Sequence, residues 1–211
     1  MNIKVCGITE LKQLTQLEGL GIEFVGLNFY ASSSRYMKDS INGDVVKGGD
    51  FDIKKVGVFV NAGYDEIMEI RDAYDLDVVQ LHGDEPPLLC EQLSEDTEVI
   101  KVFRVGEAKL DVDELVKEYD EVCDYYLFDT AAGNGSFGGT GVAFDWKKLS
   151  KAKIEKPFFL SGGIGPADPA KIKAFKHPDF YGIDINSQFE KSPGVKDMVS
   201  ILQFKQALKK K

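Results

Sequence analysis

The chain has 211 residues, 43% of them hydrophobic and 29% charged, which allows a globular domain with a substantial core and excludes a disordered or fibrous protein. Its net charge of −9, without any basic stripe, argues against a nucleic-acid-binding surface. A local anion site stays possible, because helix amino-termini and single arginines bind phosphate even in an acidic protein.

Short β-rich apolar runs recur along the chain and predict strands that are buried on both faces. In chain order they are Ile3–Cys6, Phe24–Asn28, Lys55–Val60, Val78–Leu81, Val99–Arg104, Tyr125–Asp129, Phe158–Ser161 and Gly182–Ile185. The stretches between and after them predict helices at Glu10–Leu17, Asp65–Tyr74, Pro86–Leu93, Asp113–Tyr119, Asp145–Leu149, Asp168–Phe175 and Val195–Leu208. Thr9 and Asp84 are the expected caps of the first and third of these helices. The segment DSINGDVVKGGDFD is short and broken by glycines, so we expect that crossover to be barely helical.

Eight alternations of strand and helix in this length are typical of a (β/α)8 TIM barrel of near-minimal size. We expect residues 1–211 to form this single α/β domain. A doubly wound open sheet usually carries GxGxxG after its first strand, whereas this chain has CGIT there. The pattern therefore favours the closed barrel.

Three cysteines, Cys6, Cys90 and Cys123, are too few and too scattered for a disulfide framework, and no cluster of histidine and cysteine suggests zinc. No apolar run reaches the length of a membrane helix, and MNIKVCGITE does not have the pattern of a signal peptide. We therefore expect a reduced, cytoplasmic protein with no membrane partner and no nucleic-acid partner.

The residues at the carboxyl ends of the strands are the candidates for catalysis, because the active site of such barrels lies there. Cys6 ends the first strand and Asp129 ends the sixth. A thiolate base and a carboxylic acid on either side of one small molecule suit a proton-shuffling isomerisation. Both residues have structural alternatives, since a buried cysteine is often an apolar filler and an aspartate before Thr130 often serves turn chemistry.

Other strand ends carry residues that suit the binding of an anion. Glycine loops after the sixth and seventh strands predict a nest of backbone N–H groups for a phosphate, although Gly162 and Gly163 would also permit a tight turn. Arg35, in the loop NFYASSSRY, suits a planar carboxylate but is compatible with a solvated surface position. For His82, after the fourth strand, a structural role and a catalytic role both stay open.

Longer motifs stand in a definite order along essentially the whole chain. They are KVCGIT, NFYASSSRY, VGVFVN, VQLHGDE, IKVFRV, FDT followed by GGTG, FDW, FLSGGI and PGVKD. Together they resemble the phosphoribosylanthranilate isomerase family of tryptophan biosynthesis. The resemblance implies an Amadori rearrangement of N-(5′-phosphoribosyl)anthranilate to 1-(2-carboxyphenylamino)-1-deoxyribulose 5-phosphate. It implies a small phosphosugar as the partner, with no metal and no organic cofactor.

The resemblance also implies roles for individual residues. Asp129 would be the general acid that opens the ribose ring, and Cys6 would be the general base that removes the C2′ proton. Arg35 would hold the anthranilate carboxylate and His82 would contact the substrate. Asp184 matches the family's aspartate of the eighth strand, for which a substrate contact and a structural hydrogen bond are both open. The phosphate would be held by Gly141, Gly162, Gly163 and Ser187.

One departure from the family pattern concerns the phosphate site. Asn186, Ser187 and Gln188 stand where the family commonly has a serine pair and a glycine, which can alter the backbone route to the phosphate. The short second crossover is the other departure.

Four alternative functions are compatible with parts of the pattern. The sister isomerase of histidine biosynthesis would have an aspartate in place of Cys6 and a second phosphate loop after the third strand. A metal-dependent pentose-phosphate epimerase would need more than the two histidines present. A Schiff-base aldolase would use Lys101, and a non-catalytic phosphate-binding module would need no acid–base pair. We expect a monomer or a homodimer.

Overall fold

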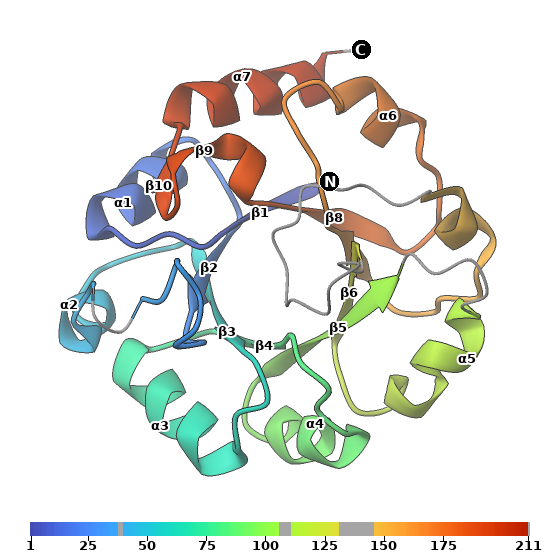
Figure 1. The fold of residues 1–211 in the computed structure, drawn as a ribbon, viewed down its shortest axis with the longest axis horizontal. Coiled ribbons are helices and arrows are strands. Elements are labelled where there is room, and N and C mark those ends of the chain that lie inside the picture. Colours follow the sequence, from blue (N-terminus) through green and yellow to red (C-terminus); the bar gives the residue numbers. More distant parts are fainter. Residues whose placement is uncertain (38–39, 106–110, 131–145, 211) are drawn as a thin grey trace.

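The predicted strands close into a parallel barrel (Figure 1). The computed structural model describes residues 1–37, 40–105, 111–130 and 146–210. Each barrel strand is hydrogen-bonded to the next in chain order, and β1 closes the ring with β8. The strands are β1 (Asn2–Cys6), β2 (Phe24–Asn28), β3 (Lys54–Phe59), β4 (Val78–Leu81), β5 (Glu98–Val105), β6 (Tyr125–Thr130), β7 (Phe158–Leu160) and β8 (Phe180–Ile185).

Helices surround the barrel on its outside (Figure 1). The α-helices are α1 (Leu11–Gly19), α2 (Gly43–Lys47), α3 (Tyr64–Tyr74), α4 (Pro87–Ser94), α5 (Val112–Val116), α6 (Pro169–Ala174) and α7 (Met198–Lys209). Three 3-10 helices complete the described part of the chain: η1 (Lys117–Tyr119), η2 (Trp146–Lys151) and η3 (Ser187–Phe189). Among the described helices, none is long and apolar enough to cross a membrane.

The two faces of each strand explain the continuous apolar runs in the sequence. Successive side chains point to opposite faces of a strand, so one set faces the helices and the other faces the barrel interior. On β1, for example, Ile3 and Val5 belong to the large core beneath the helices. A separate inner group, which we call the floor cluster, consists of Phe24, Val56, Val78, Ile100, Val102, Leu127 and Phe159.

The strand boundaries agree with the predictions to within two residues, and the five-residue α2 confirms the weak second crossover. Two predicted caps were wrong. The N-cap of α1 is Glu10, because the Thr9 hydroxyl donates instead to the carbonyl of Gly194 at 3.0 Å. The N-cap of α4 is Pro86, and Asp84 forms an ion pair with Arg104.

Two further helix predictions need correction. The segment after residue 145 forms the 3-10 helix η2 rather than an α-helix, and Asp145 itself lies outside the described residues. The predicted helix Val195–Leu208 begins only at Met198, where Asp197 caps α7 by accepting from two backbone N–H groups.

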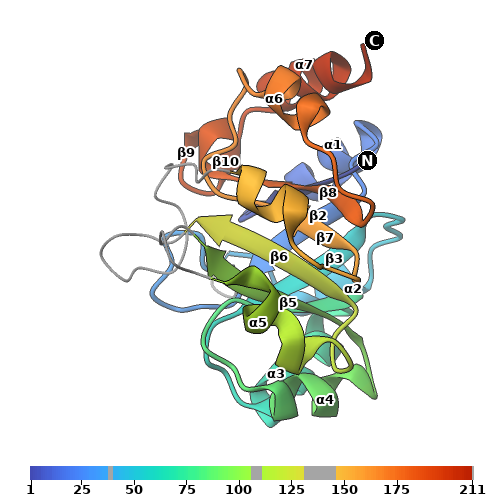
Figure 2. The same ribbon diagram turned by 90° about the vertical axis from the view of Figure 1, so that its right-hand side faces the viewer.

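An antiparallel hairpin precedes α7. It consists of β9 (Glu190–Ser192) and β10 (Val195–Lys196), and Gly194 in its turn has a φ of 83°. Figure 2 shows the hairpin at the end of the barrel toward which the arrow of β6 points. The hairpin therefore lies beside the carboxyl ends of the strands, which we call the mouth.

Candidate active site

The interior of the barrel changes from apolar to polar toward the mouth. Gln80 and Asp129 follow the floor-cluster residues Val78 and Leu127 by two positions, and Cys6 and Asp184 occupy inward positions of β1 and β8. All four are buried, with exposed fractions between 0% and 6%. Ionisable groups are rarely buried without partners, so their contacts indicate what the mouth can do.

Cys6 is the last residue of β1 and lies beside Gly26 of β2. A Cβ atom at Gly26 would be 2.6 Å from the Cys6 Sγ, so the glycine leaves the space that the thiol fills. The nearest charges are a buried ion pair between Lys4 and Asp184, whose Nζ and Oδ1 atoms are 3.1 Å apart. Burial raises the pKa of the Cys6 thiol, and the positive charge of Lys4 opposes that rise.

The same ion pair gives Asp184 a structural hydrogen bond. Burial raises the pKa of Asp184, whereas Lys4 opposes this through its charge and its hydrogen bond. For Lys4, burial alone would lower the pKa, but Asp184 and Cys6 outweigh it and the net direction is upward. Lys4 and Asp184 are therefore the charged neighbours that act on the Cys6 thiol, while a contact of Asp184 with the substrate stays a prediction.

Asp129 and His82 face each other across the mouth. The Oδ2 of Asp129 is 3.3 Å from the Nε2 of His82, and its Oδ1 accepts the backbone N–H of Thr130 at 2.8 Å. Gln80 Nε2 is 3.1 Å from the Nδ1 of His82. With the amide of Gln80 donating to Nδ1, a neutral imidazole carries its proton on Nε2, which lies near Asp129 without forming a hydrogen bond to it. The carboxyl group therefore has a proton-bearing neighbour.

The loop after β7 brings its backbone close to β6. Gly162 and Gly163 have φ values of 86° and 66°, which only glycine adopts readily, and a Cβ atom at Gly162 would be 2.1 Å from the Oγ1 of Thr130. Consecutive backbone N–H groups in such a turn form an anion-binding concavity. Ser187 begins η3 after β8, and Gly141 lies outside the described residues.

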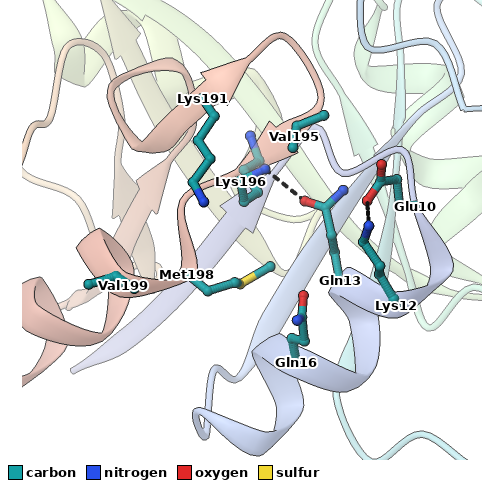
Figure 3. Close-up of a pocket in the computed structure, with 9 residues that line it drawn as sticks. All are labelled: Glu10, Lys12, Gln13, Gln16, Lys191, Val195, Lys196, Met198 and Val199. Carbon is teal, nitrogen blue, oxygen red and sulfur yellow. Dashed lines mark hydrogen bonds and ion pairs between the residues drawn. The ribbon is translucent and has the colours of Figure 1, made fainter.

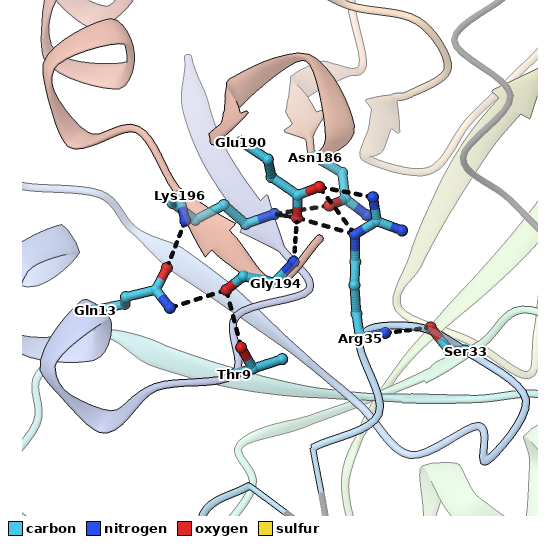
Figure 4. Close-up of polar contacts among 8 residues, drawn as sticks. All are labelled: Thr9, Gln13, Ser33, Arg35, Asn186, Glu190, Gly194 and Lys196. Carbon is cyan, nitrogen blue, oxygen red and sulfur yellow. Dashed lines mark hydrogen bonds and ion pairs between the residues drawn. The ribbon is translucent and has the colours of Figure 1, made fainter. Parts of the chain in front are cut away.

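Arg35 is paired in this structure with a residue that the sequence analysis missed. Its Nε is 2.9 Å from the Oε1 of Glu190, and its Nη2 is 2.6 Å from Oε2 (Figure 4). Glu190 belongs to the hairpin, and its Oε1 also lies 2.6 Å from the Nζ of Lys196. Because 155 residues separate Arg35 from Glu190, no local pattern signals the pair.

Lys101, the candidate Schiff-base lysine, faces the helices and not the mouth. Its Nζ is 2.6 Å from Glu85 and donates to the carbonyl of Gly83 at 3.0 Å. Glu85 is 2% exposed and also accepts the backbone N–H of Asn61 and Gly83. The lysine is therefore part of a buried ion pair that joins the loops after β3 and β4 to β5.

A hollow of about 240 Å³ lies on the other side of the hairpin, against α1 and the start of α7 (Figure 3). Its lining residues are Glu10, Lys12, Gln13, Gln16, Lys191, Val195, Lys196, Met198 and Val199. None of the residues predicted to bind or transform a substrate lines it. Among the described residues, no three His, Cys, Asp or Glu side chains lie together as a metal site requires.

Together, the mouth offers a thiol, a carboxyl group with a proton-bearing imidazole, a guanidinium and a nest of backbone N–H groups. The thiol and the carboxyl group come from β1 and β6, on different sides of the ring. A small molecule with two anionic groups and a movable proton would find an acid, a base and two anion contacts there.

Comparisons with known proteins point in the same direction. Residues 3–207 match the family model described as N-(5'phosphoribosyl)anthranilate (PRA) isomerase. An N-(5'-phosphoribosyl)anthranilate isomerase from Parabacteroides distasonis is 40% identical over 210 residues, which cover 99% of this chain and 93% of the relative. Two solved structures each cover 99% of this chain and 98% of their own. One is phosphoribosyl anthranilate isomerase from Thermotoga maritima, with 31% identity and a TM-score of 0.86. The other, with 30% identity and a TM-score of 0.82, is the same kind of enzyme in complex with reduced 1-(o-carboxyphenylamino)-1-deoxyribulose 5-phosphate.

Proposed function

Because the chain belongs to the N-(5′-phosphoribosyl)anthranilate isomerase family, we propose that Cys6 and Asp129 are the base and the acid of its Amadori rearrangement. The chain is an isomerase of tryptophan biosynthesis. Its substrate class, a small phosphosugar, is supported by the related structure that holds a reduced form of the rearranged product. The positions of the thiol and the carboxyl group at one mouth are the observation that carries the assignment.

The reaction begins at Asp129. Its carboxylic acid donates a proton to the ring oxygen of the ribose, the C1′–O bond breaks, and the nitrogen lone pair forms an iminium ion. The Nε2 of the neighbouring His82 lies 3.3 Å from the Oδ2 of this carboxyl group. The carboxylate regains its proton from solvent. A single acid or base of this kind typically accelerates a reaction about 10²-fold to 10⁴-fold.

Cys6 acts in the second half of the reaction. The positive iminium ion acidifies the C2′ proton, which the thiolate removes, and the electron pair of the C–H bond neutralises the nitrogen. The resulting enolamine tautomerises to the ketone. Lys4 supports the thiolate by its charge, although burial still leaves the pKa of Cys6 above that of an ordinary thiol.

Two anion contacts would hold the substrate between these groups. Arg35 would bind the anthranilate carboxylate, and the N–H groups of Gly162 and Gly163 would bind the phosphate together with Ser187 and Gly141. We assign Asp184 to the support of Lys4 and Cys6, on the strength of its 3.1 Å ion pair.

Loss of anthranilate-type fluorescence on mixing purified protein with freshly made phosphoribosylanthranilate tests this proposal. We expect turnover by the wild type and losses of about 10²-fold to 10⁴-fold in Cys6→Ala and Asp129→Asn. Circular dichroism would establish that both variants are folded. Absence of turnover by folded wild-type protein would favour the phosphate-binding module, and full activity of Cys6→Ala would make the thiol an apolar filler.

Three further expectations stay predictions. They are the single domain over residues 1–211, the cytoplasmic location, and the monomeric or homodimeric state. Light scattering on the purified protein would decide the last of these.

A further inference from the structure

We propose that Glu190 is a positioning residue that aims the guanidinium of Arg35 at the aryl carboxylate of the substrate. This inference rests on the proposed function, because it concerns the binding of the same substrate. It starts from the observation that Arg35 has a carboxylate partner within the protein itself.

The geometry of the pair leaves one edge of the guanidinium for a ligand. Glu190 occupies the side edge of Arg35, which consists of Nε and Nη2. A planar guanidinium has a second edge, formed by Nη1 and the other hydrogen of Nη2, that can bind another carboxylate through two parallel hydrogen bonds. Figure 4 shows no contact on this second edge among the residues drawn. Glu190 and a substrate carboxylate can therefore be bound at the same time.

Glu190 is held by several contacts, so a substrate carboxylate is not expected to displace it from Arg35. Its side chain is 4% exposed, and its Oε1 accepts from Lys196 Nζ at 2.6 Å and from the backbone N–H of Gly194 at 3.1 Å, in addition to Arg35. Burial alone would raise the pKa of Glu190, but the hydrogen bonds from Arg35 and Lys196 outweigh it and lower that pKa. Displacing Glu190 would break these hydrogen bonds and leave a buried charge unpaired, so a ligand is not expected to displace it.

The hairpin that carries Glu190 is fixed to the first strand–helix turn. Gln13 donates to the carbonyl of Gly194 at 2.9 Å and accepts the backbone N–H of Lys196 at 2.9 Å (Figure 4). The Thr9 hydroxyl donates to the same carbonyl. These hydrogen bonds connect the hairpin that carries Glu190 to the segment that follows Cys6.

The stem of Arg35 is fixed against the same turn. A Cβ atom at Gly7 would be 2.5 Å from the Arg35 Cδ, and Gly7 has a φ of 73°. The stem lies on Gly7 and the head is bound to Glu190, so contacts within the protein order both ends of this long side chain. Ordering it in advance removes a rotamer-entropy cost from binding.

The charges of the network also favour an anion. Two cations, Arg35 and Lys196, share the single carboxylate of Glu190, so these three side chains together carry one positive charge. Lys196 also lies 2.7 Å from the Oδ1 of Asn186. Asn186 immediately precedes Ser187, so the same network touches the loop expected to bind the phosphate.

The test compares two substrates in the wild type and in Glu190→Gln. One substrate is phosphoribosylanthranilate, and the other is phosphoribosylaniline, which lacks the aryl carboxylate. The measured quantity is the preference, defined as the ratio of kcat/KM for the two compounds. We expect Glu190→Gln to reduce this preference by about 10-fold to 100-fold, mainly through the KM of the carboxylated substrate. Glu98→Gln, which removes the carboxylate of a half-exposed ion pair with Lys54, is the matched control and should leave the preference unchanged.

Each other outcome overturns the proposal. An equal loss with both substrates would make Glu190 merely structural, and a lower KM for phosphoribosylanthranilate in Glu190→Gln would make it a competitor for Arg35. If Glu190→Gln does not fold, Glu190→Asp keeps the charge and shortens the side chain, and the same fall in preference is required of it. Wild-type protein that turns over neither compound would instead refute the proposed function.

Discussion

The floor and the mouth of this barrel bury side chains of opposite character in one continuous interior. At the floor, Phe24 and Phe159 meet edge-to-face with ring centroids 5.4 Å apart, and Tyr181 packs against both. Toward the mouth, the inward positions carry a thiol, carboxylates, an amide and an imidazole instead. The floor gains free energy from every buried ring, whereas each ionisable group at the mouth costs desolvation. The difference indicates that the floor stabilises the barrel and that the residues at the mouth serve the reaction.

Asp184→Asn tests the mouth and has the largest expected effect, because it changes both the free energy of unfolding and the pKa of Cys6. It leaves the Lys4 ammonium buried without its partner at 3.1 Å, so we expect the free energy of unfolding to fall by about 3–5 kcal/mol. Since Asp184 raises the pKa of Cys6, the variant should also ionise its thiol at lower pH. Urea unfolding and the pH dependence of kcat/KM measure the two effects.

The control for Asp184→Asn removes both charges. The double variant Lys4→Met/Asp184→Leu should lose less stability than Asp184→Asn, because no unpaired charge stays buried. A larger loss in the double variant would contradict the view that the unpaired ammonium causes the damage.

Phe159→Ala probes the floor and should change stability alone. We expect the free energy of unfolding to fall by about 3–5 kcal/mol, while kcat per folded molecule stays near the wild-type value. Leu88→Ala, at a position 63% exposed on α4, is the matched control and should change stability by less than about 0.5 kcal/mol. A loss of kcat in folded Phe159→Ala would contradict the view that the floor serves stability alone.

Gly162→Ala acts on the expected phosphate loop, and its expected effect on substrate binding is the smallest of these effects on the mouth. A φ of 86° costs an alanine about 1–2 kcal/mol, and its Cβ atom would displace Thr130. We expect the inhibition constant of inorganic phosphate and the KM of the substrate to rise.

Gly165→Ala is the matched control for this loop, since a Cβ atom there would be 3.7 Å from its nearest neighbour, Gln188. It should leave both constants unchanged. Equal effects of the two substitutions would argue against a phosphate contact at Gly162.

The sequence predicted the parts of this molecule that depend on local pattern. Strands buried on both faces give continuous apolar runs, which is why their ends could be placed to within two residues. The candidate positions of Cys6 and Asp129 followed from the rule that chemistry lies at strand ends. These features need no knowledge of distant contacts.

The features that the sequence did not predict depend on contacts between residues that are distant in the chain. Thr9 has the residue type of a helix cap, but its hydroxyl is bound by Gly194, 185 residues away. The hairpin strands have three and two residues, too short for a periodic pattern, and Val195 was therefore assigned to the helix that follows. The Arg35–Glu190 pair could not be predicted because it exists only once the hairpin lies beside the mouth.

The pH dependence of kcat/KM in the wild type and in Cys6→Asp tests the assignment of the base most directly. The base must be ionised, and burial raises the pKa of Cys6, so wild-type kcat/KM should still increase with pH beyond the point where an ordinary thiol ionises. In Cys6→Asp the carboxylate should ionise at far lower pH than a thiol at the same position, so the residual activity should show no such alkaline rise. An alkaline rise of the same position and size in both proteins would mean that a group other than the thiol at position 6 removes the proton.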